Sequence, residues 1–276
     1  MYKYGYMLIN SYFFTSGGST YLVDDYSLDL SFSIRKTSST ATNCLRVRRS
    51  SDNAEQDIGF NGDDLDTSAL TTFVGANDGF VVKWYNQGSG GATYDGSQTV
   101  AGTQPQIVSS GTVITSVNGY PAIKSVSADY FDMSSYTLGT EITEASVISR
   151  PTNGITTITL GYLGVQIGGL YWYSNNYLYK QVYNLAGLSQ QTLDTGSGDF
   201  VYFMSRTSGL VLNSYLNDVS KISFTEGGTT GDWTRILQNS YPSTGSLFQE
   251  INFTNTDETS NKTDIQDNIN NYYSIY

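Results

Sequence analysis

The second half of the chain repeats one pattern, in which short apolar segments follow one another at roughly ten-residue spacing. β-Branched and aromatic residues dominate within the segments, and Gly, Asn and Asp stand between them. Short apolar runs bounded by such turn formers are typical of strands. This regular succession predicts an antiparallel sandwich or jelly roll, and therefore an all-β protein. The segments fall near residues 146–149, 155–160, 165–173, 177–183, 200–205, 210–216 and 221–224.

The first half contains the clearest single strand signal, residues 26–35, where apolar side chains occupy every second position. A period of two predicts a half-buried strand. Further along, Leu45 and Val47 alternate with arginines, which predicts a strand with its charges turned outward. Asn118 and Gly119 lie between two short apolar segments and predict a tight hairpin turn.

Two segments carry a helical pattern instead. Asp66, or the residue after it, can cap a helix, and the apolar residues that follow share one helical face. A short helix is therefore predicted near 67–74. Towards the end of the chain, Ile265, Ile269 and the two tyrosines after them recur at helical spacing, which predicts a C-terminal helix near 259–273 docked on the sandwich.

Charge and cysteine usage argue against several functions. The chain has 276 residues and a formal net charge of −11, from 25 Asp and Glu against 14 Lys and Arg. A nucleic-acid partner is not expected, because binding to phosphates needs a basic surface. Cys44 is the only cysteine and there is no histidine, so an internal disulfide is ruled out and zinc lacks its usual ligands.

The chain is expected to form one jelly-roll domain over residues 21–276, preceded by an N-terminal arm or edge strand over residues 1–20. The N-terminal segment lacks the long apolar core and the cleavage site of a signal peptide. No run approaches the ~18 apolar residues of a membrane span, so membrane insertion is not expected. The surface of a virus particle is the favoured location, and an extracellular one is the alternative.

Six segments stand in a characteristic order and spacing: YSL (26–28), RVRRSSD (46–52), Ile58, LDTSAL (65–70), FVVKWYNQ (80–87) and VNGYPA (117–122). Together they resemble the catalytic domain of the arabinofuranosidase B type α-L-arabinofuranosidases. The end of the chain, EINF (250–253) with DETSNKT (257–263), resembles the wider concanavalin A-like lectin/glucanase superfamily, which includes LamG-like modules. Similar arrangements are familiar from bacteriophage structural proteins, where the sandwich decorates a tail or a head. The resemblance implies a two-sheet concanavalin A-like jelly-roll sandwich.

The catalytic residues of that family find no counterpart in this sequence. Those enzymes retain configuration, which requires two carboxyl groups about 5 to 5.5 Å apart. Their nucleophile follows a Cys-Cys-Phe-Asp-Tyr-Gly stretch that nothing here matches, and residues 145–193 contain no Asp or Glu. The family's Tyr-Asp-Gln-Ser-Gly loop also loses its carboxylate, which is replaced by Asn86. No catalytic residue is therefore assigned. If the chain is nevertheless a hydrolase, its acids would come from Glu141, Glu144, Glu226 or Glu250.

An aromatic hairpin in the second half is the candidate carbohydrate site. Aromatic rings stack on the apolar faces of sugars, and amides can hydrogen-bond to hydroxyl groups. Aromatic residues of both parities occur here, so the alternative is that one face belongs to the core and the other to a contact with a second subunit. The candidate residues are Tyr171, Trp172, Tyr173, Asn175, Asn176 and Tyr177.

A dense group of acidic residues is the one candidate for a cofactor-binding site. Its oxygens could bind calcium, as in many lectin-like sandwiches. Alternatively, Asp66 caps the helix while the others shape turns or pair with the nearby arginines. No EF-hand spacing is present, and no other metal or cofactor is expected. The group contains Glu55, Asp57, Asp63, Asp64 and Asp66.

These patterns favour a non-enzymatic protein of the virion surface, a head or tail decoration or fibre component of a bacteriophage. Its role would be structural, with glycans of the host surface as candidate ligands. Other virion proteins and further copies of the chain itself are the expected partners. Two alternatives remain: a retaining glycoside hydrolase of the arabinofuranosidase type, and a secreted carbohydrate-binding module.

Overall fold

The computed structural model describes residues 21–126, 129–150, 156–158, 169–172, 177–184, 187–195, 198–225, 231–237 and 246–276. Between residues 150 and 195 only the backbone of the strands is described. The predicted N-terminal arm, residues 1–20, lies outside the described residues. The division of the chain at residue 20 therefore stays a prediction.

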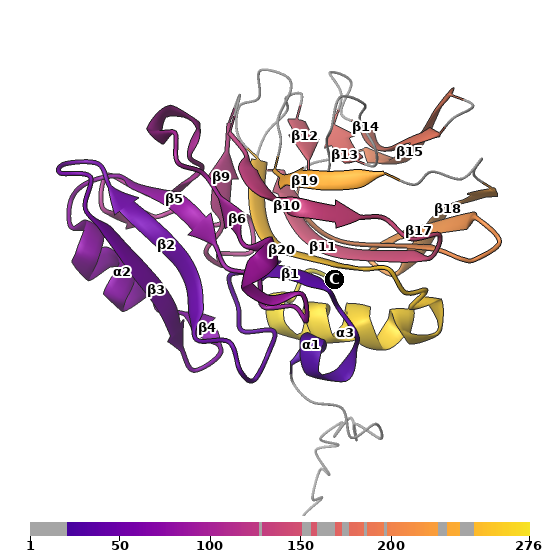
Figure 1. Cartoon of the computed structure of the whole chain (residues 1–276), viewed down its shortest axis with the longest axis horizontal. Helices are drawn as coiled ribbons and strands as arrows, with labels where there is room; N and C mark the ends of the chain where they lie inside the picture. The colour runs from indigo at the N-terminus through magenta and orange to yellow at the C-terminus, as the bar shows by residue number, and fades with distance from the viewer. Residues whose placement is uncertain are drawn as a thin grey trace, which may run out of the picture.

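One long antiparallel sheet forms the body of the fold (Figure 1). Strand β20 is central to it, because it pairs with β11 along one edge and with β1 (Leu30–Ser33) and β9 along the other. In order of pairing, the strands of this sheet are β18 (Val219–Thr225), β17 (Val211–Leu216), β16 (Gly198–Arg206), β11 (Ile142–Arg150), β20 (Ser246–Thr254), β9 (Ile123–Ser125), β7 (Gln106–Ser109), β5 (Gly79–Trp84), β2 (Asn43–Arg49), β3 (Glu55–Asn61) and β4 (Asp64–Leu65).

A second layer of strands lies over this sheet and contains β10 (Phe131–Thr137), β19 (Asp232–Ile236) and β6 (Gly96–Ser97). The ring of Trp233 on β19 lies 4.3 Å from the ring of Phe253 on β20, and Phe131 on β10 lies 6.3 Å from Trp84 on β5. All four rings are buried. Two antiparallel layers around an aromatic core confirm the predicted concanavalin A-like jelly-roll sandwich.

The shorter elements connect or extend these layers. A separate four-stranded antiparallel sheet lies along one edge of the molecule in Figure 1. It contains β12 (Thr156–Ile158), β13 (Gly169–Trp172), β14 (Tyr177–Asn184) and β15 (Gly187–Thr195). The other short elements are β8 (Thr112–Val113), α1 (Leu22–Asp25) and the 3₁₀ turns η1 (Gly91–Tyr94) and η2 (Ala101–Thr103).

Both predicted helices are confirmed. Helix α2 (Thr67–Val74) begins where expected, since the Asp66 carboxylate accepts a hydrogen bond of 2.8 Å from the backbone N–H of Ala69. Helix α3 (Lys262–Tyr273) follows a 3₁₀ turn, η3 (Thr259–Asn261), and buries Ile265, Ile269 and Tyr273. None of the described helices is long and apolar enough to cross a membrane.

The predicted half-buried strand at 26–35 differs from the structure in length and in burial. Only Leu30–Ser33 form β1, and all four of these residues are buried, the two serines included. Leu30 and Phe32 belong to the apolar core, while Ser33 lies beside Tyr273 of α3. Because the C-terminal helix covers the polar face, the alternation marks two buried faces of different chemistry and not one buried face.

Candidate functional site

The structure describes only part of the predicted aromatic hairpin. Strands β13 and β14 pair antiparallel, with Tyr171 opposite Tyr179 and Trp172 opposite Leu178. Strand β14 begins at Tyr177, and the residues between the two strands, including Tyr173, Asn175 and Asn176, lie outside the described residues. The hairpin pairing is thus observed, while the role of these residues in sugar binding stays a prediction.

Four of the five acidic residues considered for calcium, all except Glu55, accept hydrogen bonds from separate partners. Asp57 accepts two hydrogen bonds from the Arg46 guanidinium, at 2.7 and 2.9 Å, and one from the Tyr85 hydroxyl at 2.7 Å. Asp63 accepts a hydrogen bond from Tyr21, and Asp64 accepts one from a tyrosine of α3. Within the described ranges, no three His, Cys, Asp or Glu side chains gather where they could hold a metal ion. The structure therefore does not bring the predicted calcium ligands together.

Two of the four candidate catalytic glutamates are buried on opposite faces of one sheet. In the register of β11 with β20, Glu144 lies opposite Phe253, while Glu250 lies opposite Val147. Paired residues share a face, and Phe253 and Glu250 are three positions apart on a regular stretch, so their side chains point in opposite directions. Glu144 and Glu250 thus cannot face a common bond. Glu141 is half-buried just before β11, and Glu226 lies outside the described residues.

Glu250 is also fully occupied by a structural network. Arg35 donates from Nε and Nη2 to its two carboxylate oxygens, at 2.6 and 3.0 Å. Ser33 donates to it at 3.2 Å and Asn252 at 2.7 Å. All four side chains are buried, so the charge pair is shielded from water. A carboxylate held by four donors is unsuited to proton transfer or nucleophilic attack.

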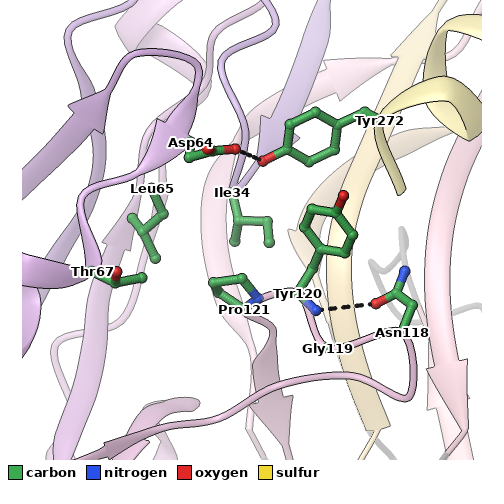
Figure 2. Close-up of a pocket in the computed structure, with 9 residues that line it drawn as sticks. All are labelled: Ile34, Asp64, Leu65, Thr67, Asn118, Gly119, Tyr120, Pro121 and Tyr272. Carbon is green, nitrogen blue, oxygen red and sulfur yellow. Dashed lines mark hydrogen bonds between the residues drawn. The ribbon is translucent and has the colours of Figure 1, made fainter. Parts of the chain in front are cut away.

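A cleft of about 420 Å³ opens where the start of α2, the loop before β9 and the end of α3 meet (Figure 2). Asp64, Leu65 and Thr67 form one wall, and the loop 118–121 forms the other. Tyr272 of α3 and Ile34, the residue after β1, lie between the walls. Parts of the chain that are far apart in sequence thus combine to form one site.

Two tyrosine rings line the aromatic side of this cleft, and a third tyrosine supports them from behind. The rings of Tyr120 and Tyr272 lie 5.1 Å apart with an angle of 42° between their planes. Tyr273 lies behind both, 5.4 Å from Tyr120 and 4.7 Å from Tyr272. Tyr273 is buried, whereas the other two rings are half-buried and line the cleft. Tyr273 thus packs against both half-buried rings and fixes their positions.

Tyr272 is held from two directions. Its hydroxyl donates a hydrogen bond to the Asp64 carboxylate across the cleft (Figure 2). On the other side, the Arg35 guanidinium carbon lies 5.2 Å from the ring centroid, within reach of a cation–π interaction. Burial raises the pKa of the Tyr272 phenol well above its usual range, and the bond to Asp64 raises it further. The phenol is therefore neutral and donates to Asp64.

The opposite wall follows from the predicted Asn118-Gly119 turn. Gly119 has a φ of +87°, which a residue with a side chain rarely adopts, and its N–H donates to the carbonyl of Ser116. The Asn118 side chain donates from Nδ2 to the backbone carbonyl of Tyr273 at 3.0 Å, and its backbone N–H donates to Asp199 at 2.5 Å. The turn is thus tied to both α3 and β16, so the cleft wall is fixed in place.

The chemistry of the cleft suits a flat, hydroxyl-bearing ligand. Two phenol rings, with Ile34, Leu65 and Pro121, supply an apolar surface. The carboxylate of Asp64, the hydroxyl of Thr67 and the backbone around Gly119 supply polar groups at the edges. A few fixed polar groups around an apolar surface are typical of small-molecule sites, and aromatic rings match the CH faces of sugars.

Sequence reasoning did not find this cleft, although it singled out most of its parts. The sequence predicts a structural role for the turn at 118–119 and for the tyrosines at the end of α3, and it makes the acidic group around Asp64 a candidate for calcium. Nothing in the local pattern indicates that they meet. A Tyr-Pro pair directly after an Asn-Gly turn is the one local signal, because it places an aromatic ring at a turn near the surface.

Comparison with known proteins supports the fold. No protein-family model matches the chain, and no curated protein matches it in sequence. Among solved structures it is similar to a GH54 α-L-arabinofuranosidase soaked with a cyclic sulfate inhibitor, with a TM-score of 0.66 and 12% identity. It is also similar to a glutamate-to-glutamine mutant of a GH54 enzyme soaked with 4-nitrophenyl α-L-arabinofuranoside, with a TM-score of 0.63 and 13% identity. An arabinofuranosidase complexed with arabinofuranosyl-α-1,2-xylobiose gives a TM-score of 0.62 at 13% identity.

Each of these likenesses covers 88% of this chain but only 62% of the compared enzyme, so the chain spans about three-fifths of their length. At 12 to 13% identity they show a shared fold. The chain therefore shares a jelly-roll β-sandwich fold with these enzymes.

Proposed function

We propose that this protein is a non-enzymatic, sugar-binding component of a virus particle, and that the cleft between Tyr120, Tyr272 and Asp64 is its binding site. The observation that carries the proposal is the pair of half-buried tyrosine rings, fixed 5.1 Å apart and bordered by polar groups. Rings that line a cleft and are already held in place bind a ligand with little loss of side-chain freedom. The aromatic hairpin at 171–177 is proposed as a second contact for a longer glycan.

The positions of Glu144 and Glu250 on opposite faces of the sheet favour sugar binding over hydrolysis. A retaining hydrolase needs two carboxyls on one side of the sheet, and these two point to opposite faces. The arabinofuranosidase fold remains the reason to test hydrolysis directly. Release of sugar from an aryl arabinofuranoside that is abolished by Glu141→Gln or Glu226→Gln would favour the enzyme instead.

The location on a virion rests on the resemblance of the sequence to bacteriophage structural proteins. We propose that other virion proteins and further copies of this chain are its partners there, and that residues 1–20 provide a contact arm. Immunogold labelling of purified particles is the test. Gold on the particle surface supports this location, and label confined to the soluble fraction contradicts it.

The binding site is tested with a glycan array followed by calorimetric titration of the strongest ligand. Tyr272→Ala removes one ring and should weaken binding at least tenfold, equal to about 1.4 kcal/mol. Tyr85→Ala is the matched control, because Tyr85 is also half-buried and also donates its hydroxyl to an aspartate, Asp57, away from the cleft. Equal affinities of wild type and Tyr272→Ala would contradict the proposed site, and a blank array would contradict the function.

A further inference from the structure

We propose that the cleft selects uncharged sugars, and that Asp64 is the residue that excludes carboxylated and sulfated ones. This inference rests on the proposed function, since it names the class of glycan that the same cleft would take. Its starting point is the charge of the lining: Asp64 is the one charged side chain among the described residues that form the cleft. Asp64 is exposed, so a ligand at the rim meets its carboxylate directly.

The positive charges of Arg35 and Lys36 do not offset it. Arg35 lies behind the Tyr272 ring and is only 3% exposed, and its guanidinium forms an ion pair with the carboxylate of Glu250. An anionic sugar on the tyrosine rings would meet the apolar ring faces and not this guanidinium. Lys36 does not line the cleft, and its ammonium group lies 5.5 Å from the ring of Tyr21. A carboxylate or sulfate group on the ligand would therefore find no counterion among the described residues that line the cleft.

Asp64 also has acceptor capacity to offer. One of its oxygens accepts the hydroxyl proton of Tyr272, and the other has no hydrogen-bond partner among the residues that the structure describes. Adjacent hydroxyl groups of a sugar ring are donors at a spacing that a carboxylate can accept. The same oxygens repel a second anion. The group that recognises hydroxyls thus discriminates against charge at the same position.

The first test is the composition of the array hits. Neutral glycans should dominate, with uronate-containing, sialylated and sulfated glycans absent or weak. An array on which acidic glycans dominate, and on which Tyr272→Ala abolishes their binding, would overturn this inference and leave the proposed site standing. A blank array would overturn the proposed function, so the two failures are distinguishable.

The second test uses matched ligands and matched variants. Oligogalacturonate and its methyl ester are built from the same sugar ring and differ only in whether the carboxyl group is charged. The ester should bind at least about fivefold more tightly than the acid at low salt. In Asp64→Asn this ratio should fall towards one, because the amide keeps an oxygen for the Tyr272 hydroxyl but carries no charge. Asp63→Asn removes the same charge from the neighbouring residue, which does not line the cleft, and should keep the ratio. Equal ratios in the two variants, or preference of the wild type for the acid, would contradict the role of Asp64.

Discussion

Arg35, which follows β1, and Glu250 of β20 form a two-point ion pair, with contacts of 2.6 and 3.0 Å, on the face of the sandwich that the C-terminal helix covers. Both side chains are buried, and the guanidinium also lies against the rings of Tyr272 and Tyr273. The acid that sequence alone made a candidate for catalysis is thus part of the support of the cleft. This relationship links the fold to the proposed site.

Breaking this pair should destabilise the protein strongly. Glu250→Ala leaves a buried guanidinium without a counterion, which costs about 3 to 5 kcal/mol in comparable pairs. Urea unfolding followed by tryptophan fluorescence measures the change. Asp132→Ala, which breaks the exposed pair with Arg235, is the control and should cost less than about 1 kcal/mol. Similar losses in the two variants would mean that Glu250 has no special structural role.

Asn86 explains the departure from the arabinofuranosidase-like loop, because its amide donates as well as accepts. Its Nδ2 donates to the carbonyls of Asp29 and Gly91, both at 3.1 Å, while its Oδ1 accepts from the backbone of Ser31 and Gly88. A carboxylate cannot donate those two bonds. We expect Asn86→Asp to lower the free energy of unfolding by about 1 to 3 kcal/mol, measured by urea unfolding.

The control for that substitution is Asn213→Asp, at a half-buried position of β17 whose side chain makes no hydrogen bond among the described residues. The same change of charge there should cost much less. If the two substitutions cost the same, charge and not the lost donor is responsible.

The Asp66 cap should contribute to the wall of the cleft that contains the start of α2. Asp66→Ala removes the acceptor for the Ala69 N–H and should cost about 1 kcal/mol, whereas Asp66→Asn should cost only a few tenths. Thermal unfolding of both variants measures this. A stability of Asp66→Ala equal to that of the wild type would show that the cap is dispensable.

Tyr85 should make the protein sensitive to alkali. Burial, followed by the hydrogen bond to Asp57, raises the pKa of its phenol from 10.0 to about 12. Since the folded state favours the neutral phenol, this contribution to stability is complete below about pH 10 and is lost as the pH rises through about 12. Unfolding free energies measured from pH 9 to 12 should therefore fall more steeply for the wild type than for Tyr85→Phe. Parallel curves would contradict this account.

The local patterns of the sequence predicted the elements well. The cap at Asp66, the turn at 118–119, the outward arginine at 46 paired with Asp57, and the C-terminal helix all follow from short-range chemistry, and the structure contains each of them. A sandwich also follows from strand spacing alone.

The burial of β1 and the position of the cleft could not be predicted in this way. The polar face of β1 is buried because helix α3, more than 200 residues later in the sequence, folds back over it. The cleft needs three segments to meet, and their meeting depends on the register of β20 with β1 and β9. Such long-range pairing leaves no signal in a local pattern.

The most direct test is a crystal structure of the protein soaked with the strongest neutral oligosaccharide from the array. The account predicts an intact sugar whose ring lies against Tyr120 and Tyr272, with hydroxyl groups within hydrogen-bond distance of Asp64. A sugar bound elsewhere with this cleft empty, or a cleaved product beside two carboxyl groups, would contradict it.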